Sequence, residues 1–116
     1  MKNMSPTIEI CPGIKRRTIT NGRTMYQMIA TLAAGSRMPP HQHAQEQIVH
    51  ILDGKMRLIV EGVPHELVTG DSFYLASNVS HGVETLLDTR VLDTFSPPRE
   101  DYLKLDAEAR QATSSP

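Results

Sequence analysis

The chain has 116 residues, with 12 basic and 13 acidic side chains and a formal net charge of −1. A near-neutral chain without a basic stripe argues against nucleic acid as a partner. No segment approaches the roughly 20 apolar residues that a membrane-spanning helix requires, and a single cysteine excludes an internal disulfide framework. We therefore expect one cytoplasmic domain over residues 1–116, with its core from about residue 14 to 103.

Short apolar runs alternate with turn signals along most of the chain, a pattern typical of a sandwich or barrel of strands. Asn21-Gly22 and Asp53-Gly54 are dipeptides that favour two-residue hairpins. Residues 101–112 are the one stretch with helical character, and we predict one or two helical turns there, packed across the barrel. The charged run at residues 15–17 is interpreted as a solvated surface. Further turns and strand-like runs lie between and after the hairpin signals, at residues 24–35, 61–64, 69–71, 71–76 and 89–95.

Two histidines, His41 and His43, stand one residue apart after a pair of prolines. Alternate residues of a strand share a face, so an extended run from residue 41 places Gln47 beside both histidines. A third histidine, His81, lies in a later punctuated segment. Imidazole ligands suit Zn, Ni, Cu, Fe or Mn, and the Gln47 amide oxygen would add a weaker fourth ligand. The alternative is two surface histidines beside a proline turn. The remaining histidines are interpreted as structural, His50 and His65.

A second group of candidate residues lies near the C-terminus, around a second pair of prolines. Asp93 and Phe95 share the parity of one strand, and the prolines end that strand just before Arg99. An acid, an aromatic wall and an arginine could line one opening of the barrel, where arginine is a natural bidentate partner for a carboxylate. The alternative is that Asp93 is a hydrogen-bonded buried acid and Phe95 part of the core. Arg99 would then form a surface pair with Glu100 or Asp101.

Residues 35–54, GSRMPPHQHAQEQIVHILDG, resemble the first motif of the cupin family, G-x5-H-x-H-x3-E-x6-G, with Gln47 in place of the glutamate. Residues 70–85, GDSFYLASNVSHGVET, are similar to the second motif, although three of its positions differ. The resemblance implies an all-β fold, the double-stranded β-helix or jelly-roll barrel of cupins, to which we add the short C-terminal helical segment. It also implies four metal ligands, His41, His43, Gln47 and His81. A divalent ion held by these neutral ligands keeps its full charge and favours an anionic partner.

The run DTFSPPREDYL, residues 93–103, together with H-x-H-x3-Q, resembles small cupins of the KdgF type in pectin degradation. These proteins open the ring of 4,5-unsaturated uronate monosaccharides. The resemblance implies the same reaction on a small anionic sugar from pectin or alginate, giving a linear keto-uronate. It implies a divalent metal, Zn or Ni before Fe, Mn or Cu, and catalytic roles for Asp93, Phe95 and Arg99. By analogy with other cupins we also expect a homodimer.

Two other classes of function fit the same residues. Many cupins bind Fe or Cu and activate oxygen, so the three histidines also suit a metal-dependent dioxygenase. The acid, phenylalanine and arginine near the C-terminus have no task in that reaction. A non-catalytic protein that binds a sugar acid is the other alternative, and it would hold a uronate without converting it.

Overall fold

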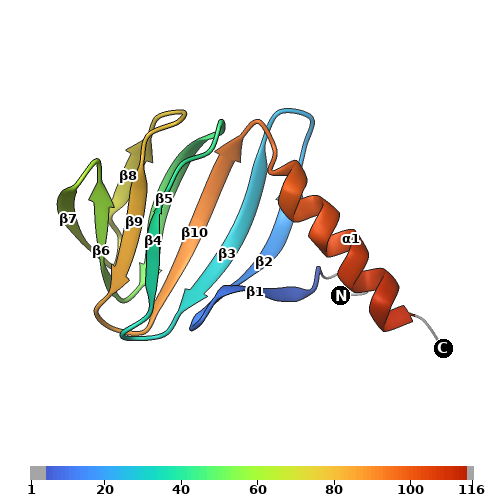
Figure 1. Cartoon of the computed structure of the whole chain (residues 1–116), viewed down its shortest axis with the longest axis horizontal. Helices are drawn as coiled ribbons and strands as arrows, with labels where there is room; N and C mark the ends of the chain where they lie inside the picture. Colours follow the sequence, from blue (N-terminus) through green and yellow to red (C-terminus); the bar gives the residue numbers. More distant parts are fainter. Residues whose placement is uncertain (1–4, 115–116) are drawn as a thin grey trace.

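The computed structural model describes residues 5–114. The described residues form ten strands and one helix, with bounds β1 Thr7–Cys11, β2 Ile14–Asn21, β3 Tyr26–Leu32, β4 Arg37–His41, β5 Glu46–Asp53, β6 Lys55–Val60, β7 Val63–Val68, β8 Ser72–Leu75, β9 His81–Thr85, β10 Thr89–Ser96 and α1 Glu100–Ser114. The strands make a six-stranded sheet of order β1-β2-β3-β10-β5-β8 and a four-stranded sheet of order β4-β9-β6-β7, all antiparallel pairs (Figure 1). This architecture confirms the predicted all-β, jelly-roll class with a C-terminal helix.

The core lies between the two sheets, and alternating burial along each strand shows which side chains face it. In β5 the odd-numbered residues Gln47, Val49 and Ile51 are buried, whereas its even-numbered residues are exposed or half-buried. The odd-numbered residues of β10 are buried in the same way. Because side chains of a strand alternate between faces, the parity expected for residues 47–51 and for β10 is confirmed. The extended run expected from residue 41 is wrong, because the chain leaves β4 after His41 and begins β5 at Glu46 in the other sheet.

Both predicted hairpins are wrong in detail. Asp53-Gly54 does not close a hairpin, because β5 and β6 belong to different sheets and Gly54, with a φ of 116°, forms the corner between them. The β2–β3 hairpin has a longer loop at residues 22–25. The two-residue hairpin lies at Glu61-Gly62, where φ values of 49° and 81° suit a type I′ turn. The dipeptide alone does not distinguish a hairpin from a change of sheet.

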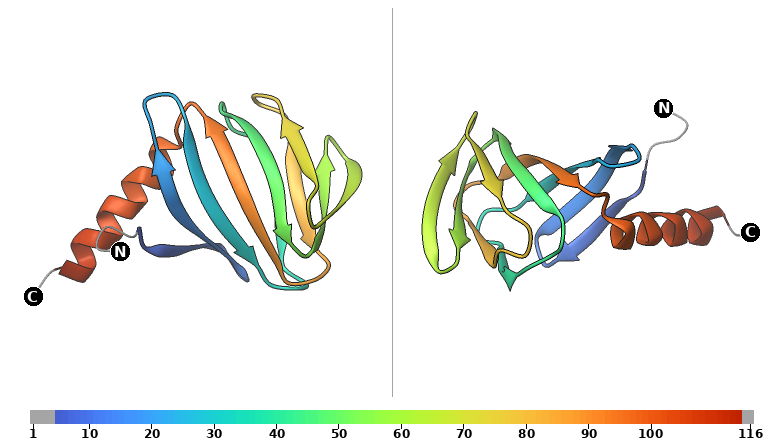
Figure 2. Two further views of the ribbon diagram at one scale, coloured as in Figure 1. Left: turned by 180° about the vertical axis from the view of Figure 1, so that it is seen from behind. Right: turned by 90° about the horizontal axis from the view of Figure 1, so that it is seen from above.

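Helix α1 has 15 residues, so it is longer than the one or two turns expected. It extends away from the sheets instead of lying across them (Figure 2). Its beginning packs on the inner face of the six-stranded sheet, where Tyr102 and Leu103 contact a cluster of Tyr26, Met28 and Phe95. Only the beginning of the helix therefore packs against this cluster. Within residues 5–114, no helix has the length and apolar character that would span a membrane.

Arg16 contradicts the interpretation of residues 15–17 as a solvated run. Its side chain is 1% exposed, and its Nη1 donates to Oδ1 of Asp106, which is 0% exposed, at 2.7 Å. The Thr18 hydroxyl donates to the other oxygen of Asp106 at 2.6 Å. Strand alternation explains the error, because only the middle residue of the run points toward the core. The buried ion pair anchors α1 to β2.

Candidate metal centre and active site

The structure brings together the three histidines of the two motif segments. His41, at the end of β4, and His81, at the start of β9, are register partners in the four-stranded sheet. His43 lies in the loop that follows β4. One ring nitrogen from each histidine lies within 4.8 Å of the others, close enough for the three to share one metal ion. The strand that carries His41 also holds two prolines, which β4 tolerates because it is an edge strand.

Hydrogen bonds to the backbone orient all three rings. The Nδ1 atoms of the three histidines lie 3.1, 2.9 and 2.9 Å from the carbonyl oxygens of Pro39, Gln45 and Val79. A carbonyl only accepts, so each Nδ1 carries the proton and each Nε2 keeps a free lone pair. Burial lowers the pKa of His43 and brings that of His81 to about 4, so both rings are neutral at pH 7. Neutral rings fixed in this way are suited to metal ligation.

The Gln47 amide completes the candidate ligand set from the opposite sheet. Its Oε1 lies 3.1 Å from Nε2 of His43, and its Nε2 donates to Oδ1 of Asp93 at 2.8 Å. The bond to Asp93 fixes the amide, so its oxygen faces a deprotonated ring nitrogen. Two acceptors in contact repel one another unless a cation lies between them. The donor set therefore fits a divalent ion, which these four neutral residues could bind.

Asp93 is the acid nearest to the candidate ligands. Its side chain is 6% exposed and lies on the inner face of β10. Burial raises the pKa of Asp93 to about 7, although the hydrogen bond from Gln47 and the charge of Arg99 oppose the shift. A bound cation would lower the pKa again. Asp93 is therefore a hydrogen-bonded buried acid, as the alternative expected, and it also faces the cavity that the candidate ligands line.

One cavity joins the two groups of residues that the sequence analysis singled out. Its lining combines many apolar side chains with a second set that holds both groups, His41, His43, Gln47, His81, Asp93, Phe95, Arg99 and Tyr102. Phe95 forms part of the wall, with its ring centroid 5.5 Å from that of His43 and 5.8 Å from that of Tyr26. The acid, the aromatic ring and the arginine thus line the same cavity as the histidines.

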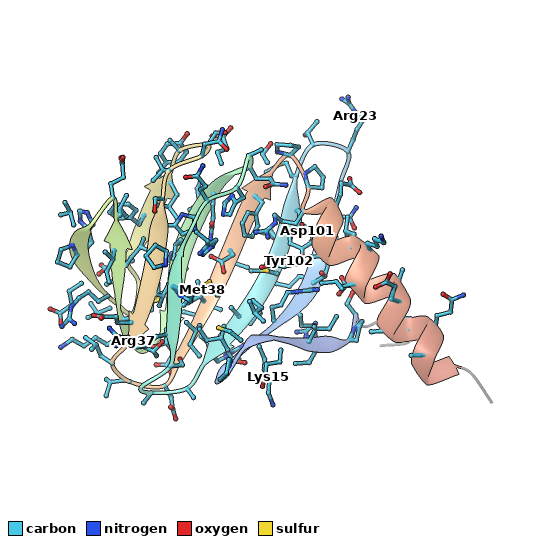
Figure 3. The ribbon with its side chains drawn as sticks, in the orientation of Figure 1. Lys15, Arg23, Arg37, Met38, Asp101 and Tyr102 are labelled. Atoms are coloured by element: carbon cyan, nitrogen blue, oxygen red, sulfur yellow. The ribbon has the colours of Figure 1, made fainter. Side chains whose placement is uncertain are left out.

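Arg99 lines this cavity while it pairs with a surface carboxylate. Its Nε and Nη2 donate to the two oxygens of Asp101 at 3.1 and 3.0 Å. Its guanidinium lies 3.9 Å from the ring centre of Tyr102 and 4.9 Å from that of Phe95. Figure 3 shows Asp101 and Tyr102 at the start of α1. The predicted pairing with Asp101 therefore exists, but the arginine side chain itself is only 10% exposed.

Sequence reasoning missed Tyr102 as a lining residue and Arg16 as its support. The Arg16 guanidinium lies 4.2 Å from the centre of the Tyr102 ring. The alternation of residues 14, 16 and 18 on the inner face of β2 was a usable signal for Arg16, whereas no local pattern marks Tyr102. The two histidines interpreted as structural lie outside the cluster. His50 is hydrogen-bonded to the Ser72 hydroxyl, and the His65 ring packs at a tilt against Phe73.

Comparisons with known proteins agree with this fold. Residues 28–95, more than half of the chain, match the family described as "Cupin domain". The pectin degradation protein KdgF of Dickeya dadantii is 37% identical over 101 residues, which cover 85% of this chain and 92% of that protein. The structure of KdgF from Halomonas sp. superposes with a TM-score of 0.79 at 29% identity, covering 84% of this chain and 90% of that one.

A more distant relative is the dimethylsulfoniopropionate lyase DddW of Ruegeria pomeroyi, 31% identical over 74 residues. That match covers 60% of this chain and only 49% of the lyase. The KdgF matches extend over most of both chains. The chain belongs to the cupin family and, within it, to the KdgF group.

Proposed function

We propose that this protein opens the ring of 4,5-unsaturated uronate monosaccharides and releases linear keto-uronates, in the breakdown of pectin or alginate. The similarity to a pectin degradation protein over most of both chains supports this function. The main structural support for this function is the position of two side chains. Asp93 is hydrogen-bonded to a candidate metal ligand, Gln47, at 2.8 Å, and Arg99 lines the same cavity.

The reaction is an isomerisation, so it needs neither a redox partner nor an organic cofactor. The substrate is a cyclic hemiacetal with a C4=C5 double bond and a carboxylate. Its anomeric hydroxyl loses a proton, the bond between C1 and the ring oxygen breaks, and C1 becomes an aldehyde. The ring oxygen is left as an enolate oxygen on C5, and a proton added at C4 converts the enolate to a ketone. One proton leaves and one is taken up.

Asp93 would take the proton from the anomeric hydroxyl as general base and return it to C4 as general acid. Arg99 would hold the substrate carboxylate through paired hydrogen bonds. Phe95 would pack against the sugar ring and keep water from the reacting atoms. A divalent ion such as Zn or Ni, with Fe, Mn or Cu as further candidates, would supply electrostatic stabilisation of the developing enolate. We assign its binding to His41, His43, Gln47 and His81.

The direct test follows the C4 vinyl proton of a purified unsaturated uronate by NMR, against the spontaneous rate without protein. Asp93→Asn keeps an oxygen that can accept the Gln47 hydrogen bond but cannot act as a base. We expect it to lower the catalysed rate by about 100-fold or more. Glu108→Gln serves as the control, because Glu108 is an exposed residue of α1 and its replacement should leave full activity. A rate for Asp93→Asn equal to that of the unchanged protein would disprove the catalytic assignment.

A lyase acting on dimethylsulfoniopropionate is the second candidate, because DddW is 31% identical over part of the chain. The sulfonium group of that substrate is a cation. The proposed site combines an arginine with a metal ion whose ligands are all neutral, which disfavours a cationic group. Release of dimethyl sulfide into the headspace, without uronate conversion, would favour the lyase. Oxygen uptake with Fe(II) would identify a dioxygenase, and uronate binding without turnover would identify a binding protein.

We also propose a homodimer that forms through the outer face of the six-stranded sheet. Register partners Ile48 and Tyr74 are 48% and 57% exposed there, and the neighbouring partners Ile29 and Leu92 share the face. An exposed apolar patch on a sheet is a suitable surface for a second copy of the same chain. A cytoplasmic location remains a prediction, in keeping with a Cys11 thiol that has no disulfide partner.

A further inference from the structure

The guanidinium of Arg99 has two edges that can each bind a carboxylate. One edge is formed by Nε and Nη2, and the other by Nη1 and the second hydrogen of Nη2. Asp101 occupies the first edge with two hydrogen bonds of 3.1 and 3.0 Å. Neither of these bonds uses Nη1, and Arg99 lines the cavity of the candidate active site. Asp101 therefore leaves the second edge to a ligand.

Two aromatic rings also contact the plane of the Arg99 guanidinium. Tyr102 lies 3.9 Å from it on α1, and Phe95 lies 4.9 Å from it on β10. Tyr102 is itself fixed, because Arg16 stacks on its ring and donates from Nη2 to its backbone carbonyl at 3.3 Å. The first turn of α1, which carries Asp101, is thus anchored to β2.

We propose that Asp101 is a positioning residue for substrate binding. Its carboxylate fixes the Nε and Nη2 edge of Arg99, so that the Nη1 edge is presented to the carboxylate of a sugar acid. This inference rests on the proposed function, in which Arg99 binds the substrate carboxylate. An arginine ordered in advance loses less side-chain freedom when the substrate binds, which strengthens binding without adding a contact.

Asp101 also stands in the first turn of α1, where an acidic residue stabilises a helix through its dipole. Glu100 separates the two roles. It is exposed, it carries the same charge in the same helical turn, and it makes no hydrogen bond to Arg99. Glu100→Gln and Asp101→Asn therefore remove one equal charge each, but only the second change releases the arginine.

The experiment compares these two variants with the unchanged protein. Calorimetry measures the dissociation constants for D-galacturonate and for D-galactose, which lacks the carboxylate, and NMR measures KM and kcat for an unsaturated uronate. Relative to Glu100→Gln, we expect Asp101→Asn to raise the galacturonate dissociation constant and KM by roughly 3- to 10-fold, with kcat changed less than about 2-fold. Galactose binding should not differ between the variants.

A second readout does not depend on a ligand. Exchange of the Arg99 Nε proton, followed by 15N NMR, should be slow in the unchanged protein and in Glu100→Gln, and fast in Asp101→Asn. The proposal is overturned if Asp101→Asn binds galacturonate as Glu100→Gln does, or more tightly, or if the unchanged protein does not bind galacturonate. Binding that responds as expected, without any ring opening, would refute the proposed function and leave the role of Asp101 intact.

Discussion

Replacing Asp106 with alanine would leave the Arg16 guanidinium buried without a counter-charge. The two side chains are 1% and 0% exposed, so water cannot replace the lost carboxylate without opening the packing of α1 on β2. The change also removes the acceptor of the Thr18 hydroxyl hydrogen bond. Arg16 already has an Nε without a hydrogen-bond partner, so no spare interaction compensates.

Removing one partner of a buried ion pair costs about 3–5 kcal/mol of the free energy of unfolding. The entropy of unfolding is roughly 2.1 cal/mol/K per residue, or about 0.24 kcal/mol/K for 116 residues. The Tm should therefore fall by about 12–20 °C. Replacing both partners, as Arg16→Met with Asp106→Leu, removes the unpaired charge and should restore most of the loss.

Thermal unfolding followed by circular dichroism, with urea unfolding as a check, measures these differences. Glu108→Ala is the matched control, because Glu108 is an exposed acid on the same helix and its loss should change stability by less than about 0.5 kcal/mol. A fall in Tm below about 4 °C for Asp106→Ala would refute the reasoning, since it corresponds to only about 1 kcal/mol. A double variant as unstable as the single one would refute it equally.

The metal site and the sheet face lead to three more predictions. In calorimetry, Gln47→Glu should bind a divalent metal about 10-fold more tightly, because the added negative charge attracts the cation. The same charge offsets that of the metal, so the variant should convert the uronate more slowly, and equal or faster turnover would contradict this. His43→Ala should lose bound metal in elemental analysis whereas His65→Ala retains it, and equal metal content would exclude the proposed ligand set. Ile48→Glu with Tyr74→Glu should give a monomer in light scattering, and a persistent dimer would move the interface elsewhere.

Local regularities determined much of the site from the sequence. The two-residue period of a strand places Gln47 and Val49 on the inner face of β5, and the same period places Asp93 and Phe95 on the inner face of β10. A proline pair ends β10 before Arg99 because proline cannot continue the ladder. These properties depend only on residues that are close together in the chain, so the sequence alone determines them.

Contacts between distant elements were decided only by the tertiary structure. Arg16 finds its partner 90 residues away, on a helix whose length and direction no local signal indicated. Asp53-Gly54 turns a corner between sheets because of which strands pair, and the dipeptide has the same preferences in a hairpin. The contact between Gln47 and Asp93 needs β5 beside β10. Spacing tells which face a side chain occupies, whereas the packing of sheets and helix determines what lies opposite it.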